Sequence, residues 1–307
     1  MTSFRRQGQG PYQVSDQLRG MLLVALAAFG FSSMHAMIRL LSASLHPFEV
    51  AFFRNFFGLL ILTPVLLRRG LAPLRTKRLP LHALRSVLQM GSMLLFFTAL
   101  SLTPIARISA MSFTAPLFAT VGAVLFLREA IHARRVAALL VGFAGAMIVM
   151  RPGAEMDTGL VLVLLSSAGW AVALLVIKSL SSSDSSLTLA LWMGLFMAPL
   201  SLFPAALVWT WPDAGDYLLL VVMGATGTAS HLCMAEAFRK ADASAVLPVD
   251  FTRLVWASLL GLVIFGEVPE LPTLIGGTVI FTSTAYIAYR EARISARASA
   301  APKQQNS

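Results

Sequence analysis

The chain has 307 residues, of which 57% are hydrophobic and only 12% are charged, and its mean hydropathy is +0.76. A soluble globular domain carries about 25% charged residues, so this composition excludes an ordinary soluble protein and indicates the lipid bilayer as solvent. The net charge of +10 does not point to nucleic acid, because the basic residues gather beside apolar runs. Cys233 is the single cysteine, which excludes an intrachain disulfide and a cysteine metal cluster.

Ten apolar runs follow one another along the chain, and each is long enough to cross a membrane, which takes about 20 residues. We expect spans at residues 19–41, 47–67, 82–102, 105–127, 132–150, 158–180, 187–210, 216–238, 243–265 and 270–289. Residues 1–18 are polar and lack the apolar core of a signal peptide, so the first run is expected to be retained. Residues 291–307 form a second polar tail, and no room remains for a soluble catalytic domain.

Basic residues predict the orientation, because the cytoplasmic loops of membrane proteins are enriched in Lys and Arg. With residues 1–18 inside, nineteen of the 24 basic residues lie on the inner side, six of them from Arg68 to Arg85, around the connection of the second and third spans. Arg107 and Arg151 lie outside, whereas Arg39, Arg54 and Arg253 fall within spans. The sequence therefore predicts a bacterial inner-membrane protein with both tails in the cytoplasm.

The two halves of the chain resemble each other. At a shift of 138 residues, Phe113, Thr114, Ala119 and Glu129 match Phe251, Thr252, Ala257 and Glu267. A shift of 139 aligns the first span with the sixth, with Gly30 on Gly169 and Arg39 on Lys178. Because five spans is an odd number, the repeats at residues 19–151 and 158–290 must lie in opposite orientations. Inverted repeats are typical of secondary transporters, whose site lies at the repeat interface.

Several stretches carry a resemblance to a known family, namely "LVALAAFGFSSMHAMIRLL", "LLSSAGWAVALLVIKSL", "PLFATVGAVLFLRE" and "LVWASLLGLVIFGE". Together with the ten spans, they resemble the drug/metabolite transporter superfamily, in its EamA-type members with two five-span repeats. The segments "DSSLT" and "LPVDFTRLVWASLLG" resemble bacterial members that import riboflavin or S-adenosylmethionine. The resemblance implies alternating access through a central cavity lined mainly by spans one, three, four, six, eight and nine.

Asp250 and Arg253 are charged residues inside the ninth span, three positions apart and therefore close enough to pair on a helix. Charged residues within a span usually face the bundle interior or a water-filled cavity. In one interpretation Arg253 binds an anionic or carbonyl-bearing solute and Asp250 handles a proton or a cationic group. In the other, the pair only fastens this span to its neighbours. The equivalent positions in the first half hold Ser112 and Ala115, so the halves differ where specificity would arise.

Aromatic and histidine residues complete the predicted substrate-binding set. They are Trp170, Phe113, Phe251, Trp256, His35 and His231, besides Asp250, Arg253 and Ser112. The aromatic side chains suit a flat ring system but equally suit helix packing beside small residues. A histidine at membrane depth relays a proton or simply donates one hydrogen bond to a neighbour.

Other polar residues in the spans favour structural roles. We expect Arg54 and Asn55 to lie at the periphery of the cavity, with Arg54 structural or reaching toward the lipid interface. Glu129 and Glu267 end the fourth and ninth spans on opposite faces, which indicates loop capping or gating rather than solute contact.

The sequence thus predicts a secondary transporter that takes up riboflavin or a similar vitamin or nucleoside-like metabolite, with Asp250 as the proton-coupling candidate. An exporter of amino acids, metabolites or drugs with the same fold is the alternative within the class. An intramembrane enzyme is the rival class, but no ligand-spaced metal cluster, G-x-S-G nucleophile or phosphate loop occurs. We expect no cofactor, no metal and no catalytic residue, and a protein that works as a monomer or homodimer in the bilayer.

Overall fold

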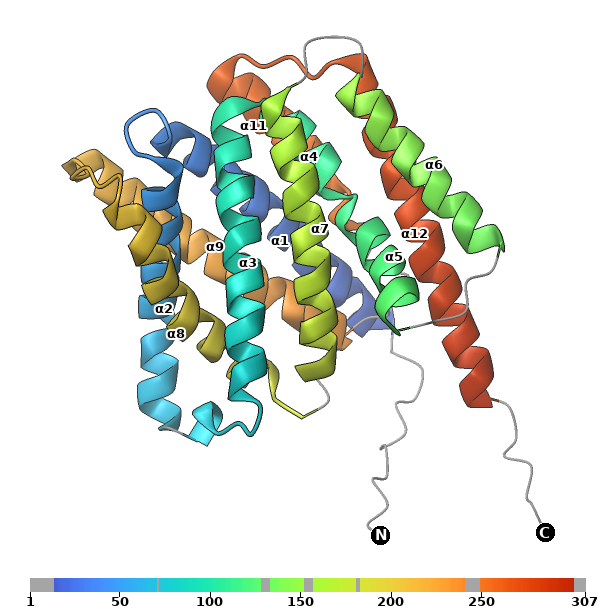
Figure 1. Ribbon diagram of the computed structural model, residues 1–307, viewed down its shortest axis with the longest axis horizontal. Coiled ribbons are helices and arrows are strands. Elements are labelled where there is room, and N and C mark those ends of the chain that lie inside the picture. The colour runs from blue at the N-terminus through green and yellow to red at the C-terminus, as the bar shows by residue number, and fades with distance from the viewer. Residues whose placement is uncertain are drawn as a thin grey trace.

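The computed structural model describes residues 14–70, 72–127, 133–151, 157–180, 183–240 and 249–300. These residues form a helical bundle (Figure 1). The elements are α1 (Val14–Leu41), α2 (Pro47–Arg69), the 3-10 helix η1 (Ala72–Leu74), α3 (Leu79–Leu102), α4 (Ile105–Ser112), α5 (Ala115–Leu127), α6 (Ala133–Met150), α7 (Thr158–Leu180), α8 (Ser186–Ala206), α9 (Ala214–Lys240), α11 (Thr252–Phe265) and α12 (Leu271–Ala300).

The spans are visible as apolar helices. Within the described residues, eight helical segments are long and apolar enough to cross a membrane, and Val136–Met150 and Thr252–Phe265 are shorter apolar helices. The expectation of an all-α membrane protein is confirmed. Two helices extend beyond the predicted spans and into the segments expected to be tails. Helix α1 begins at Val14, and α12 continues to Ala300.

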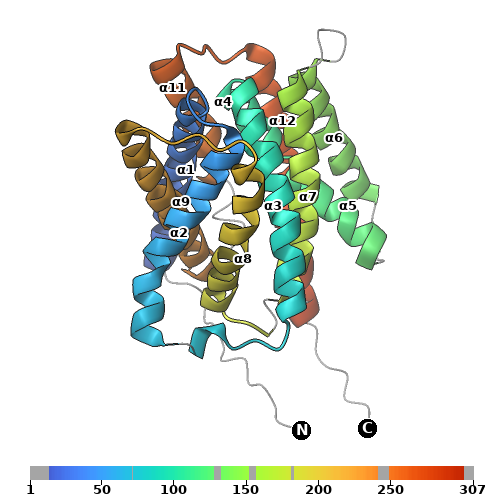
Figure 2. The same ribbon diagram turned by 60° about the vertical axis from the view of Figure 1, so that its left-hand side comes forward.

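The connections between helices gather at two ends of the bundle (Figures 1 and 2). The α2–α3 and α7–α8 connections lie at one end, which we call the basic end because it carries Arg68, Arg75, Lys77 and Arg78. The α1–α2, α3–α4 and α11–α12 connections lie at the other, which we call the opposite end. Glu49 closes α2 there: its carboxylate accepts from the backbone of His46 (3.1 Å) and of Thr210 (2.7 Å), which joins α2 to the α8–α9 connection.

Helix packing follows the inverted duplication. In the core, α1 packs against α9, and the equivalent helices of the other half, α7 and α3, pack in the same way. The contacts of α1 with α11 are likewise matched by those of α7 with α5. At the flanks, α2 lies along α8 and α6 along α12 (Figures 1 and 2). Each of these pairs joins one helix from each half, so the repeat interface runs through the centre of the bundle.

Two close approaches repeat this symmetry at the level of single residues. A Cβ added at Gly30 would collide with Ser230 Oγ, and a Cβ at Gly169 would collide with Ser92 Oγ. The two glycines are equivalent in the duplication, and so are the two serines. The same glycine–serine contact therefore sets the spacing of α1 from α9 and of α7 from α3.

The fourth and ninth spans differ from the continuous helices that their apolar runs suggest. A turn at Phe113–Thr114 separates α4 from α5, and a turn at Phe251 precedes α11. At each break a threonine hydroxyl bonds the carbonyl three residues back, from Thr114 to Met111 and from Thr252 to Val249. Such bonds compete with the backbone hydrogen bonds of a helix. Both breaks lie halfway along the bundle, beside the cavity described next.

Candidate solute-binding site

A cavity of about 430 Å³ lies in the centre of the bundle, between the two repeats. Its lining comes from α1, α3, α4, α5, α7, α9 and α11, which correspond to the spans that the family resemblance implies. Two further helices, α2 and α12, also contribute side chains. A concave site with mostly apolar walls and a few polar groups is the usual form of a small-molecule site.

Asp250 and Arg253 form an ion pair on the wall of this cavity. Arg253 Nη2 lies 3.0 Å from Asp250 Oδ2, and the two side chains are 20% and 18% exposed. The Arg253 guanidinium lies over the Phe113 ring, 4.9 Å from the ring centroid. The backbone carbonyl of Arg253 accepts a hydrogen bond from the Ser32 hydroxyl. Asp250 Oδ1 and Arg253 Nε are buried and have no hydrogen-bond partner among the described residues. The pair therefore keeps one acceptor and one donor for a further group.

The predicted aromatic residues fall into two groups. Trp170 and Phe113 line the cavity. Phe251 does not reach the lining but stacks on Phe281, a cavity residue, with the ring centroids 4.3 Å apart. Trp256 also lies off the lining and forms a T-shaped pair with Phe29, with the ring centroids 5.0 Å apart. Only the first group is placed to contact a solute directly.

Both predicted histidines and Ser112 line the cavity. His35 is only 5% exposed, its ring lies 5.0 Å from that of Phe96, and its Nδ1 has no partner among the described residues. The His231 and Phe31 rings form a T-shaped pair with their centroids 4.9 Å apart. Ser112 donates its hydroxyl hydrogen to the backbone of its own helix, so that its oxygen stays free to accept.

Helix α3 supplies cavity residues that the sequence analysis missed, namely Gln89, Ser92, Met93, Phe96 and Phe97. Gln89 is 5% exposed; its amide nitrogen donates to Met193 Sδ at 3.1 Å, and its Oε1 has no partner among the described residues. The available signal was the placement of Gln89 and Ser92 three positions apart in an apolar run, which puts both on one face of a helix.

Arg54 corrects one expectation. It does not lie at the periphery or reach toward lipid but lines the central cavity and is only 9% exposed. The cause is the packing of α2 between α8 and α9, which turns this face of α2 inward. Arg54 Nη1 donates to Asn55 Oδ1 at 3.1 Å, and Asn55 Nδ2 donates to Ser201 Oγ at 3.3 Å.

Ionic contacts close the bundle at the opposite end. Glu267 lies 2.5 Å from Arg39, and its second oxygen accepts from the backbone N–H of Ile105 at 3.1 Å, at the start of α4. Asp157 at the start of α7 binds Arg107 of α4 at 2.9 Å. These contacts link α1, α4 and α7 with the end of the ninth span. Glu129, the equivalent of Glu267, lies outside the described residues.

At the basic end, the Asp184 carboxylate links neighbouring segments through hydrogen bonds. It accepts hydrogen bonds from His82 Nε2 at 2.7 Å and from Thr76 Oγ1 at 2.8 Å, which joins the α7–α8 connection to α3 and the segment before it. The hydrogen bond from His82 is the main cause of a lowered pKa of the Asp184 carboxyl group. Arg78 adds a bond to the Ser179 carbonyl at 2.7 Å.

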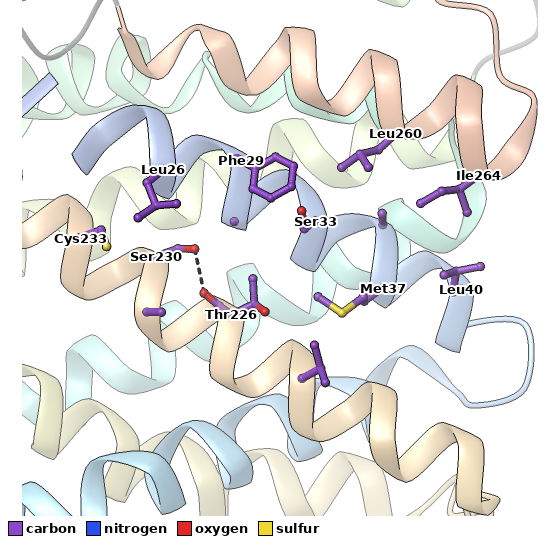
Figure 3. A pocket seen from close by; sticks show the side chains of 14 residues that line it. Leu26, Phe29, Ser33, Met37, Leu40, Thr226, Ser230, Cys233, Leu260 and Ile264 are labelled. Atoms are coloured by element: carbon purple, nitrogen blue, oxygen red, sulfur yellow. Dashed lines mark hydrogen bonds between the residues drawn. The ribbon is translucent and has the colours of Figure 1, made fainter. Parts of the chain in front are cut away.

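A second hollow, of about 550 Å³, lies on another side of α1, between α9 and α11 (Figure 3). Its wall consists of apolar and small side chains, among them Leu26, Phe29, Leu260 and Ile264, and Ser230 turns its hydroxyl back to the Thr226 carbonyl. No charged side chain of the described residues lines it, and Leu26 and Phe29 are 58% and 42% exposed. This face suits lipid chains rather than a polar solute.

Comparisons with known proteins agree with this architecture. The family model of the EamA-like transporter family matches residues 18–151 and 157–289. The S-adenosylmethionine uptake transporter of Rickettsia bellii is 31% identical over 87% of this chain and 92% of its own. The riboflavin transporter of Vibrio cholerae is 33% identical over 91% and 96%. The pseudopaline exporter of Pseudomonas aeruginosa is 28% identical over 87% and 95%.

A solved crystal structure shares the fold, with a TM-score of 0.60 over 91% of this chain and 99% of the other at 20% identity. The family and the names of these relatives are those of membrane transporters for small molecules, not of enzymes. The two matched regions, the inverted packing and the central cavity agree with one another. The chain therefore belongs to the EamA-like transporter family.

Proposed function

We propose that this transporter takes up riboflavin or a similar vitamin or nucleoside-like metabolite across the bacterial inner membrane by alternating access. The observation that carries the proposal is the central cavity, where aromatic rings and unpartnered polar atoms face the same space. Relatives named for riboflavin and S-adenosylmethionine uptake support it, because both solutes combine a flat heteroaromatic ring with a polar chain.

Aromatic side chains of the cavity suit the ring of such a solute. Trp170, Phe31, Phe96 and Phe113 come from four different helices and line one space. Rings prefer offset-stacked or edge-to-face contacts, and such a pair contributes about 0.5–1.5 kcal/mol beyond the area that it buries. Two or three of these contacts would hold a flat ring, and they require no charged group on the solute.

Polar atoms of the cavity suit the remaining part of the solute. His35 Nδ1, Gln89 Oε1, Asp250 Oδ1 and Arg253 Nε are buried without partners among the described residues. Leaving such a group unpaired costs about 1–3 kcal/mol. A solute that carries both donors and acceptors would remove part of this cost on binding, whereas a purely apolar one would not.

In alternating access, the cavity would open at one end of the bundle while the contacts at the other end close it. The basic end is assigned to the cytoplasm because basic residues concentrate there. Opening toward the outside requires the Glu267–Arg39 and Asp157–Arg107 contacts to separate. We assign proton coupling to Asp250, since it is a carboxylate in the cavity wall and protonation would release Arg253.

A growth-rescue assay tests the function. A riboflavin auxotroph that lacks its own importer should grow on low riboflavin when it carries this gene. Failure to rescue growth, together with raised resistance to excess amino acids or drugs, would favour export, the activity that the name of the Pseudomonas relative states.

Variants refine the test. Asp250→Asn and Arg253→Gln should each lower uptake at least ten-fold, whereas Glu270→Gln, which removes an exposed ion pair with Arg151, should leave uptake unchanged. In vesicles, an imposed pH gradient should stimulate uptake by the wild type but not by Asp250→Asn. An unchanged gradient response in that variant would refute its role in coupling, though not the transporter assignment.

A further inference from the structure

We propose that Arg54 is a substrate-binding residue that receives a carboxylate group of the solute, so that the preferred solutes join a ring system to a carboxylate. The proposal rests on the proposed function, because Arg54 lines the same cavity as the aromatic side chains. It divides the candidate solutes, since riboflavin has no carboxylate and S-adenosylmethionine has one on its amino-acid part.

Arg54 is a buried charge whose partners are neutral. It is 9% exposed, and its hydrogen bond goes to the amide oxygen of Asn55, which in turn bonds the hydroxyl of Ser201. Among the described residues, no carboxylate lies within ion-pair distance of it. A buried charge without an opposite charge is strongly unfavourable, and charged residues that persist inside a membrane mark substrate or ion pathways.

The charge of the cavity wall points in the same direction. Among the described residues, the charged side chains of this wall are Arg54, Arg253 and Asp250, and Asp250 is already paired with Arg253. One positive charge is therefore left over. A second buried arginine, Arg85 on α3, also bonds neutral groups, the carbonyl of Leu189 and the sulfur of Met193. A solute with a negative group would complement this excess.

The geometry of the guanidinium favours a carboxylate over a single acceptor. Nη1 is engaged with Asn55, which leaves the edge formed by Nε and Nη2, and no described residue accepts a hydrogen bond from either atom. Gly227 of α9 borders this edge: a Cβ added there would lie in van der Waals contact with Nε, at 3.6 Å, and would collide with Met34 Sδ at 2.6 Å, so that only glycine leaves this place unfilled. Two parallel N–H donors match the two oxygens of a carboxylate.

The test uses the purified full-length protein in detergent and a pair of probes that differ only in the carboxylate, S-adenosylmethionine and its decarboxylated derivative. Riboflavin serves as the neutral ring probe. Thermal stabilisation at several probe concentrations yields each Kd. The wild type should bind the carboxylate-bearing probe at least ten-fold more tightly than the decarboxylated one, and Arg54→Gln should abolish this preference. Arg68→Gln, on the exposed part of the same helix, should retain it.

Asn55→Asp is a second variant that keeps the guanidinium. It places a carboxylate where the amide oxygen now accepts from Arg54 Nη1 at 3.1 Å, and so supplies an internal competitor for the solute. We expect it to lose the preference for the carboxylate-bearing probe as Arg54→Gln does. A folded Asn55→Asp protein thus tests the role of Arg54 even if Arg54→Gln does not fold.

The outcomes separate the two proposals. Equal affinity of the wild type for the paired probes, or binding of riboflavin alone that Arg54→Gln leaves unchanged, would overturn the role of Arg54 while supporting the proposed function. If none of the three probes binds and none is taken up by cells, the proposed function fails, and the assignment of Arg54 falls with it.

Discussion

The contact between α6 and α12 offers a sharp test of the packing, because it depends on two glycines that each face backbone atoms of the other helix. A Cβ added at Gly276 would lie 2.6 Å from the carbonyl oxygen of Gly145 and 3.1 Å from the backbone nitrogen of Val149. An ordinary carbon–oxygen contact is about 3.3–3.6 Å. Backbone atoms cannot rotate away, so Gly276→Ala must move the two helices apart by roughly 0.7–1 Å.

The expected cost follows from two opposing effects. Overpacking a close contact costs about 1–3 kcal/mol, whereas alanine in place of glycine in a helix contributes about 0.5–1 kcal/mol of stability. Gly276→Ala should therefore destabilise the protein by about 0.5–2 kcal/mol. Gly91→Ala in α3 is the matched control, because nothing lies within 4 Å of its added Cβ and only the helix-propensity gain applies.

Thermal unfolding of both variants in the same detergent measures the difference. We expect Gly276→Ala to melt below the wild type and Gly91→Ala at or above it. If Gly276→Ala melts as high as Gly91→Ala, α6 and α12 do not approach as closely as the structure shows, and the account of this part of the interface is wrong.

Three further predictions concern the ends of the bundle. In a double-mutant cycle with Arg39→Gln and Glu267→Gln, thermal unfolding should reveal a coupling free energy of about 0.5–3 kcal/mol, and additive effects would show that the pair does not hold the opposite end. Because the pKa of Asp184 lies below its ordinary value of 3.8, its contribution to stability is present above that pH and is lost as the pH falls through the lowered value. The melting temperatures of the wild type and Asp184→Asn should therefore differ near pH 7 and converge in acid. A difference that stays constant with pH would contradict this prediction. Glu49→Ala should lower the unfolding free energy by about 2–3 kcal/mol, since this fully buried carboxylate accepts from two backbone N–H groups, and an unchanged melting temperature would count against the bonds described.

The spans and their inverted arrangement were accessible from sequence for a physical reason. In a bilayer every span must be a long apolar run, and loop charges follow the side of the membrane. The breaks within two spans were not accessible in this way, because both lie inside apolar runs that are long enough for a whole span. The threonine that follows each phenylalanine, which bonds back to the preceding turn, is the feature that both breaks share.

The inward direction of Arg54 could not be read from hydrophobic periodicity. In a soluble protein a polar face tells which side of a helix meets solvent, but lipid-facing and protein-facing sides of a membrane helix are both apolar. Around Arg54 stand Phe52, Phe53, Phe56 and Phe57, which leave no polar stripe. The burial of Arg54 depends on the packing of α2 against α8 and α9, and this is tertiary information.

A shared scaffold with an unshared site explains how one duplicated fold can serve different solutes. Ser112, Ala115, Asp250 and Arg253 all line the cavity, and the duplication relates the first two to the last two. The equivalent positions thus face the same space, yet only the pair in the second half is charged. Packing residues agree between the halves, as in the contacts of Gly30 with Ser230 and of Gly169 with Ser92, whereas a solute has no two-fold symmetry and is recognised by what differs. Substitutions that restore the symmetry, such as Asp250→Ser with Arg253→Ala, should therefore abolish uptake while leaving the melting temperature near that of the wild type.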